Sequence, residues 1–330
     1  MVQRYLIHIL LSAIGLVLSS GAFAADLTTS FYTALNSQQS LSAQEQEILS
    51  GYDVYLVPGI LSEAFVDGDD RSSITFSRLT GEYFETQRKL LQNQYGLKVQ
   101  RLSSSSKSVA DIRSNIRKAL ADSRSAHRKA LFITHSLGGL ALLEELVSFP
   151  SHQNTLAGIL FLQSPFQGSP IADVYFEGPL HLDKWLKPVI PYFNTSPETI
   201  RYLSTISRKQ FMTENHAIIR DLVQRIPIIT VGGVVNGHSS LFTPAVNIIA
   251  TGCFKIVLGQ CVIRTSFAGP FDSSDGMVPF ESSKIEGADF IRLEGVDHGE
   301  TVVGIPFEQY DKSQVTTALL KTLLSKIGIN

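Results

Sequence analysis

One serine in this 330-residue sequence lies where a chain would present it as a nucleophile. Ser136 follows an apolar run, residues 130–133, that predicts a buried strand, and it precedes an apolar-rich stretch, residues 140–146, that predicts a helix. The residues between them, Thr134-His-Ser-Leu-Gly138, predict a sharp turn. A serine on a tight strand-to-helix turn has an exposed hydroxyl above the helix N-terminus and a free backbone N–H beside it. Acyl transfer is the chemistry that such an arrangement serves.

A serine nucleophile needs a base to take the hydroxyl proton and a carboxylate to orient that base. Two later segments offer these groups after strand-like runs: Asp275 in an Asp-Gly turn, and His298 in a short loop that contains glycine. Each feature alone is commonplace. The three residues together, in the order Ser136, Asp275, His298, are a much more specific signal than any one of them. Asp272 and Asp297 are alternative acids, although Asp297 is adjacent to His298 and its side chain would point elsewhere.

The negative oxygen that forms during acyl transfer needs two N–H donors. The backbone N–H of Leu137, directly after the serine, is the first candidate. The second is expected from residues 57–61, where Gly59 allows the backbone to approach closely and the N–H of Ile60 is the candidate donor. The alternative is a strand-ending Pro-Gly turn with no catalytic task. His135, inside the serine turn, is expected to point away from the nucleophile's hydroxyl.

Strand-like runs alternate with helical patterns along the chain, which predicts an α/β fold with a mostly parallel, doubly wound sheet. Right-handed crossovers place helices on both faces of such a sheet, and functional groups gather at the carboxyl ends of its strands. Residues 26–50 predict a mobile or helical lead-in. The strands are predicted at 52–57, 97–101, 130–133, 158–162, 226–231 and 289–293, and the clearest helices at 109–120, 140–146 and 314–327.

The chain resembles the α/β-hydrolase superfamily and, within it, the bacterial triacylglycerol lipases and carboxylesterases. Four parts of the sequence carry the resemblance, which extends from about residue 54 to residue 300. They are Val57-Pro-Gly-Ile-Leu61, similar to the oxyanion loop; Thr134-His-Ser-Leu-Gly-Gly139, similar to the serine motif; Ser164–Asp173, similar to the stretch after the next strand; and Asp275-Gly-Met-Val278 with Asp297-His298, similar to the acid and histidine loops.

Two positions depart from the family pattern. Pro58 stands where the oxyanion loop usually has histidine, and Thr134 replaces the first glycine of the serine motif, where a β-carbon crowds the strand–helix contact. The resemblance otherwise implies an ester hydrolase with Ser136 as nucleophile, His298 as base and Asp275 as the residue that fixes the histidine tautomer. It implies no cofactor. The calcium site of some family members cannot be mapped onto this sequence, so no metal is expected.

The sequence supports three functions to different degrees. The first is an exported serine esterase that acts on small or lipid-like carboxylic esters, with transient contact with a membrane surface. The second keeps the fold and changes the acceptor, as in an acyltransferase or a phospholipid or lipoprotein deacylase. The third is an inactive hydrolase retained as a binding protein, which only the two departures favour. Residues 174–225 are rich in aromatic side chains and are expected to form a helical lid or acyl-chain wall.

The N-terminus predicts a secretory signal peptide over residues 1–24. A positive residue, an apolar region and a small-residue segment follow one another, with Ala22 and Ala24 at the positions that define the cleavage site. A membrane anchor is the alternative, but the apolar stretch is shorter than the about 20 residues needed to span a bilayer. We expect export to the periplasm or the medium, and residues 25–330 are expected to form one domain with 174–225 inserted.

Composition excludes some classes of partner. The net charge is −2 and no strongly basic block occurs, which argues against nucleic acid. The only two cysteines, Cys253 and Cys261, are expected to pair in an exported protein and to staple a hairpin or loop. Without histidines at ligand spacing, two cysteines do not predict a metal site. The sequence leaves the oligomeric state open.

Overall fold

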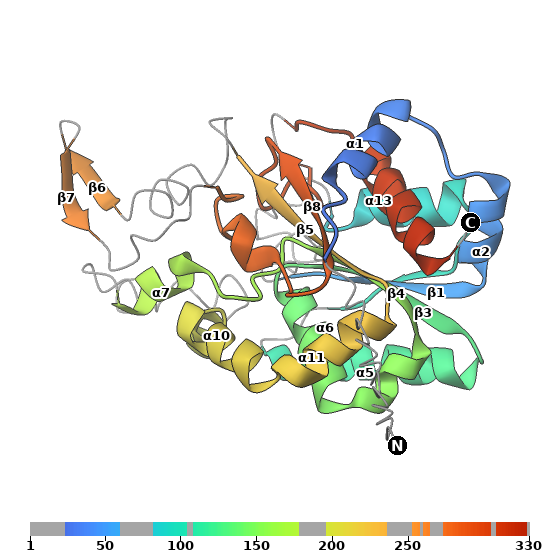
Figure 1. Cartoon of the computed structure of the whole chain (residues 1–330), viewed down its shortest axis with the longest axis horizontal. Coiled ribbons are helices and arrows are strands. Elements are labelled where there is room, and N and C mark those ends of the chain that lie inside the picture. Colours follow the sequence, from blue (N-terminus) through green and yellow to red (C-terminus); the bar gives the residue numbers. More distant parts are fainter. Residues whose placement is uncertain are drawn as a thin grey trace, which may run out of the picture.

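Six strands of the described residues form a fully parallel sheet at the centre of the molecule (Figure 1). Its strand order is β2-β1-β3-β4-β5-β8, which confirms the predicted α/β fold with a parallel sheet. The strands are β1 (Tyr52–Val57), β2 (Val99–Arg101), β3 (Lys129–His135), β4 (Leu156–Leu162), β5 (Ile228–Val234) and β8 (Asp289–Glu294). The computed structural model describes residues 24–59, 82–103, 108–177, 196–235, 253–257, 260–264, 273–304 and 308–328, without the side chains of 176–177, 253–257 and 261–264.

Helices cover both faces of the sheet, as predicted. One face lies under α1 (Thr28–Ser37), α13 (Lys312–Ile327) and the short α4 (Glu85–Lys89), which continues into the π-helical turn η2 (Leu90–Gln94). The other face lies under α5 (Val109–Ser125), α6 (Leu137–Ser148) and α11 (His216–Arg225). Figure 1 shows these two helical layers above and below the strands.

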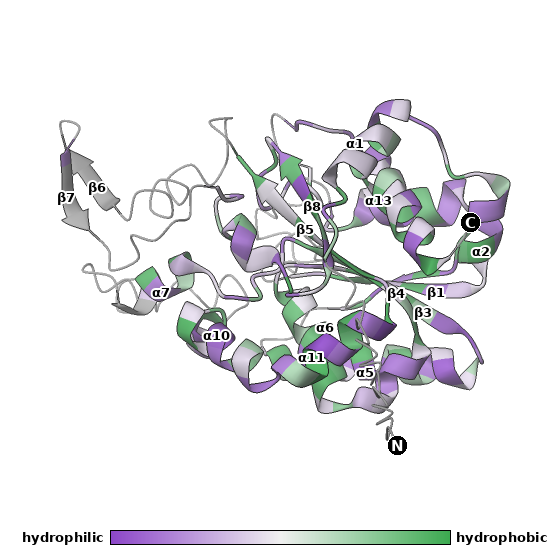
Figure 2. Ribbon diagram, viewed as in Figure 1, coloured by the Kyte–Doolittle hydropathy of each residue, from purple (hydrophilic) through white to green (hydrophobic). Residues whose placement is uncertain are grey.

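Strand β3 shows how the two layers are built. Leu131 and Ile133 pack into the hydrophobic cluster with α1 and α13, whereas Ala130 and Phe132 pack into the cluster with α5 and α6. All four side chains are buried. Strands that are covered on both faces are apolar throughout, which explains why they are visible in the sequence as continuous apolar runs. Figure 2 shows the hydrophobic residues gathered in the strands and in α6, with hydrophilic residues on the outer helices.

The lead-in at residues 26–50 is helical and contacts the sheet. It forms α1 and α2 (Ala43–Ser50), and α2 begins with a capping box in which Ser42 and Glu45 bond each other's backbone N–H. A capping box satisfies two donors that a helix start leaves unpaired. Just before α1, the N–H of Leu27 donates to the carbonyl of Phe290 in β8 at 2.8 Å. This segment therefore continues the edge of the sheet beside β8.

Four described helices overlap the predicted insertion at 174–225, and the first of them begins just before it. These are α7 (Pro170–Glu177), α9 (Pro197–Tyr202), α10 (Thr205–Glu214) and α11. Asp173 ties two of them together, because its carboxylate accepts from the N–H and the hydroxyl of Thr205 at 2.9 and 2.7 Å. α11 places Ile219 and Leu222 in the cluster under the sheet and so belongs to the helical layer. Residues 178–195, with part of the predicted lid, lie outside the described residues.

The two cysteines lie in an antiparallel hairpin separate from the main sheet, formed by β6 (Cys253–Val257) and β7 (Gln260–Arg264). In its register Cys253 pairs with Arg264, and Cys261 pairs with Ile256. The cysteine side chains lie outside the described part of the structure, so their disulfide stays a prediction. The predicted signal peptide also lies outside it, except for Ala24. Among the described residues no helix combines the length and apolar character needed to cross a membrane.

Candidate active site

Ser136 forms the turn between β3 and α6, in a backbone conformation that L-residues rarely adopt. Its φ is 52° and its ψ is −123°. Such a conformation is strained, and it is typical of a nucleophile held on a strand-to-helix turn. Gly138 permits the turn: a β-carbon there would lie 2.5 Å from the carbonyl oxygen of Val57 and 2.6 Å from that of Pro58. The predicted sharp turn therefore depends on close approach between α6 and the end of β1.

The three predicted residues, Ser136, His298 and Asp275, lie together at the carboxyl edge of the sheet. Nε2 of His298 is 3.0 Å from Oγ of Ser136, and Nδ1 of His298 is 2.8 Å from Oδ2 of Asp275. The serine follows β3, the histidine follows β8, and the aspartate lies in the segment between β5 and β8. The N–H of His298 also donates to the carbonyl of Asp275 at 2.9 Å, which joins the two loops through their backbones.

Asp275 is surrounded by hydrogen-bond donors. Its side chain is almost fully buried, and Oδ1 accepts from the N–H groups of Met277 at 2.9 Å and Val278 at 2.7 Å. These bonds close the predicted Asp-Gly turn around the carboxylate and fix the direction of Oδ2 toward the imidazole of His298. Both of these N–H groups therefore have a side-chain acceptor within the turn.

The alternative acid Asp297 has a different task. Its Oδ1 accepts from the N–H groups of Gly299 at 2.8 Å and Glu300 at 3.1 Å, and thus caps the turn that follows the histidine. Asp272 lies outside the described residues. The side chain of Asp275 is hydrogen-bonded to the ring of His298.

Gln163 is a member of this site that the sequence reading missed. It follows β4, is fully buried, and has a positive φ of 50°. Its amide nitrogen donates to Oδ2 of Asp275 at 2.9 Å and to the carbonyl of Asp297 at 2.8 Å, while its amide oxygen accepts from the hydroxyl of Thr301 at 2.6 Å. One side chain therefore links the acid loop to the histidine loop. The available signal was a polar residue placed directly after a buried strand.

The oxyanion donors are only partly described. Leu137 is the first residue of α6, where a backbone N–H has no acceptor within its own helix. Ile60 lies outside the described residues, but the preceding Gly59 is described. A β-carbon on Gly59 would lie 2.8 Å from the β-carbon of Ser136. Glycine at 59 is therefore what allows this loop to approach the serine.

No family model and no curated protein matches the sequence. Solved structures do. The metagenomic carboxyl esterase MGS0156 superposes with a TM-score of 0.63 at 18% identity, over 87% of this chain and 78% of that one. The mature lipase BlEst2 of Bacillus licheniformis superposes with a TM-score of 0.54 at 15% identity, over 85% of this chain and 93% of that one. Lipase 1 of Pelosinus fermentans superposes with a TM-score of 0.51 at 14% identity, over 83% of this chain and 98% of that one. This chain has the α/β-hydrolase fold.

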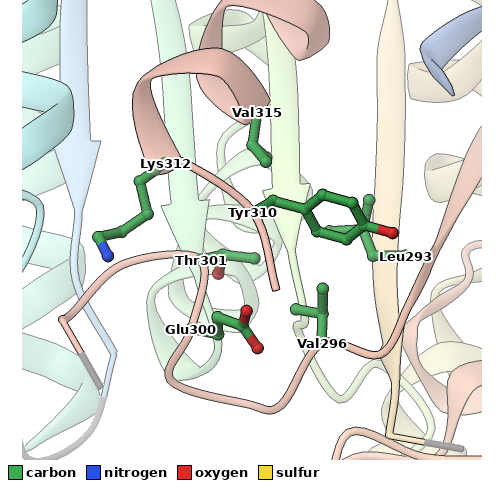
Figure 3. Close-up of a pocket in the computed structure, with 7 residues that line it drawn as sticks. All are labelled: Leu293, Val296, Glu300, Thr301, Tyr310, Lys312 and Val315. Atoms are coloured by element: carbon green, nitrogen blue, oxygen red, sulfur yellow. The ribbon is translucent and has the colours of Figure 1, made fainter. Parts of the chain in front are cut away.

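Behind the histidine loop of this α/β-hydrolase fold lies a small pocket, between the end of β8 and the start of α13 (Figure 3). Its volume is about 10 Å³, enough for about one water molecule. Glu300, one of its lining residues, accepts from the N–H of Asp297 at 3.3 Å, and burial raises the pKa of its carboxyl. Thr301, another, bonds Gln163. Residues that line the pocket thus hold the histidine loop in place, and the pocket is too small for an ester substrate.

The geometry of this candidate site is compatible with nucleophilic catalysis through a serine. A hydroxyl lies within hydrogen-bond reach of an imidazole nitrogen, and the opposite nitrogen bonds a buried carboxylate, which is the relation that activates a serine. Within the described residues no three side chains among His, Cys, Asp and Glu form a group that could hold a metal ion.

Proposed function

We propose that this protein hydrolyses carboxylic esters through an acyl-enzyme on Ser136. The observation that carries the proposal is the unbroken chain of contacts from Oγ of Ser136 to the imidazole of His298 and on to Asp275. The strained φ of Ser136 adds to it, because strain of this kind persists at sites where function needs it.

The proposed reaction has two half-reactions. Oγ of Ser136 attacks the ester carbonyl carbon while its proton moves to Nε2 of His298. Asp275 keeps the proton of Nδ1 in place and stabilises the imidazolium. The N–H groups of Leu137 and Ile60 would bind the negative oxygen. As the C–O bond breaks, the leaving alkoxide takes the proton from Nε2, and the acyl group stays on the serine. A water molecule then repeats the sequence and releases the acid.

Lipid-like esters are the substrate class that we propose. The fold is shared with proteins described as a carboxyl esterase and as lipases. The aromatic content of residues 174–215, ahead of α11, supports a lid or acyl-chain wall there. The apolar N-terminal segment, residues 1–24, supports export, and contact with a membrane surface would follow from a lipid substrate.

The test compares p-nitrophenyl esters of short and long acyl chains with the wild type and the Ser136→Ala variant. We expect turnover of at least one ester by the wild type and a loss of about 10⁴-fold or more in kcat/KM in the variant. A fluorophosphonate probe should label the wild type alone. Equal activity of both proteins would reject the assignment. Transfer to an added alcohol that outruns hydrolysis would instead favour an acyltransferase.

A further inference from the structure

The ring of His135, the residue before the nucleophile, connects two parts of the site. His135 is buried, with Nδ1 2.5 Å from the hydroxyl of Tyr83 and Nε2 2.8 Å from the backbone oxygen of His298. The Tyr83 hydroxyl also accepts from the N–H of Gly59 at 3.2 Å. A continuous chain of hydrogen bonds therefore runs from Gly59, in the loop that approaches Ser136, through Tyr83 and His135 to the backbone of His298.

The partners allow one assignment of protons. A carbonyl oxygen can only accept, so Nε2 of His135 carries a proton that it donates to His298. In the neutral ring Nδ1 is then an acceptor, and the Tyr83 hydroxyl donates to it. The Tyr83 oxygen keeps a lone pair for the N–H of Gly59, which can only donate. Each of these donors faces an acceptor, and the tautomer is fixed by its neighbours.

A charged His135 would disturb this arrangement. Both ring nitrogens would then be donors, and the Tyr83 proton would lose its acceptor. Burial, together with the nearby His298, holds the pKa of His135 well below its ordinary value. Burial likewise raises the pKa of Tyr83, which keeps its hydroxyl protonated. A neutral ring matters for the chemistry as well, because the His135 and His298 ring centroids are only 4.8 Å apart. A second positive charge at that distance would oppose the imidazolium that forms on His298 during the reaction.

We propose that Tyr83 and His135 are positioning residues for the ester hydrolysis proposed above, on which this inference rests. His135, oriented by Tyr83, holds the backbone of His298 so that the imidazole stays within reach of Ser136. Such a tether is needed because of where His298 lies in the fold. His298 lies in a loop after β8 with no helix or strand of its own.

Two backbone contacts hold that loop position from opposite sides. The N–H of His298 donates to the carbonyl of Asp275, and its carbonyl accepts from His135. Removing the second contact leaves the ring free to shift relative to the serine, and a shift of about 1 Å can lower a rate about 100-fold.

Three variants test the tether. His135→Asn removes the donor that reaches His298, whereas His135→Gln keeps an amide N–H near the position of Nε2. Tyr83→Phe removes the hydroxyl that orients the ring. We expect kcat to fall about 10- to 100-fold in His135→Asn and about 10-fold in Tyr83→Phe, with KM within about threefold of the wild type. His135→Gln should recover most of the lost kcat.

Tyr55→Phe is the matched control, since its buried hydroxyl bonds Ser123 at 2.8 Å and the carbonyl of Ala119, away from the site. It should lower the unfolding midpoint as Tyr83→Phe does while leaving kcat unchanged.

Wild-type kcat in both His135→Asn and Tyr83→Phe, beside an inactive Ser136→Ala, would overturn the tether and leave the proposed function intact. Activity retained in Ser136→Ala would reject the proposed function itself. If His135→Asn does not fold, the kcat of Tyr83→Phe relative to Tyr55→Phe decides the question.

Discussion

The amide nitrogen of Gln163 donates, at 2.9 Å, to the same oxygen of Asp275 that faces the ring of His298. The proposed acid, Asp275, is therefore oriented by a side chain from a third strand end, in addition to its own turn. Groups that orient metal ligands in this way commonly contribute about 10- to 100-fold to activity, and we expect an effect of similar size here.

Replacement of Gln163 by Leu should consequently lower kcat by about 10- to 100-fold with little change in KM, because the substrate does not contact this side chain in the proposed mechanism. Steady-state kinetics on a p-nitrophenyl ester measure the effect. Gln153→Leu is the matched control: Gln153 is equally buried and donates to the carbonyl of Leu146 at 3.0 Å, outside the triad. A similar loss of kcat in both variants would show that the effect is one of general stability.

The choice between the two described acids can be tested by amide substitutions. Asp275→Asn keeps the size of the side chain but no longer fixes the Nδ1–H tautomer of His298, so kcat should fall about 10⁴-fold. Asp297→Asn retains an oxygen that can accept from Gly299 and Glu300, so its kcat should remain within about threefold of the wild type. If Asp297→Asn had the larger effect, Asp275 would not be the triad acid.

Stability should depend on pH through His135. Its folded pKa lies well below the ordinary value of 6.5, so below pH 6.5 the unfolded chain binds a proton that the folded chain does not. The contribution of the neutral ring to stability is therefore complete above pH 6.5 and is lost progressively as the pH falls toward the folded pKa. For one group the slope can reach about 1.4 kcal/mol per pH unit.

Urea unfolding of the wild type and His135→Gln between pH 7.5 and pH 5 would measure this slope. The variant lacks the titrating ring, so its stability should fall less steeply in the acid range. Tyr83 and His298 face position 135 in both proteins, so the difference between the two slopes reports the His135 ring together with its coupling to these neighbours. Parallel curves for the two proteins would contradict the prediction.

The sequence predicted the sheet, and it predicted that Ser136, Asp275 and His298 lie together, for a physical reason. Strands buried on both faces are apolar runs, and the polar residues that follow them in a parallel sheet meet at one edge. Ser136 stands directly after such a run, whereas His298 follows β8, a strand of mixed apolar and polar residues. The structure brings both together with Asp275. The positions of the strands, together with the order of the serine, acid and histidine in the chain, predicted that these residues meet at one edge of the sheet.

The supporting contacts could not be predicted in the same way. Tyr83 and His135 are 52 residues apart, and Gln163 and Asp275 are 112 apart. A hydrogen bond between single side chains leaves no periodic pattern in the sequence, so only the folded arrangement identifies such partners. The lid, the disulfide and the donor at Ile60 stay predictions, because residues 178–195, the cysteine side chains and Ile60 lie outside the described part of the chain.

Thr134, the departure from the family's glycine in the serine turn, carries a stability prediction. It lies in β3 opposite Val57 and Phe161, and its hydroxyl is buried with no hydrogen-bond partner among the described residues. A buried polar group without a partner lowers stability by about 1–3 kcal/mol. Thr134→Val replaces the hydroxyl by a methyl group of similar size, so the free energy of unfolding should rise by about 1 kcal/mol. Thr134→Ser keeps the hydroxyl, loses the methyl group and should be less stable than the wild type by about 1 kcal/mol. Urea denaturation at pH 7.5 measures both changes, and a Thr134→Val protein less stable than the wild type would mean that the hydroxyl has a partner in solution.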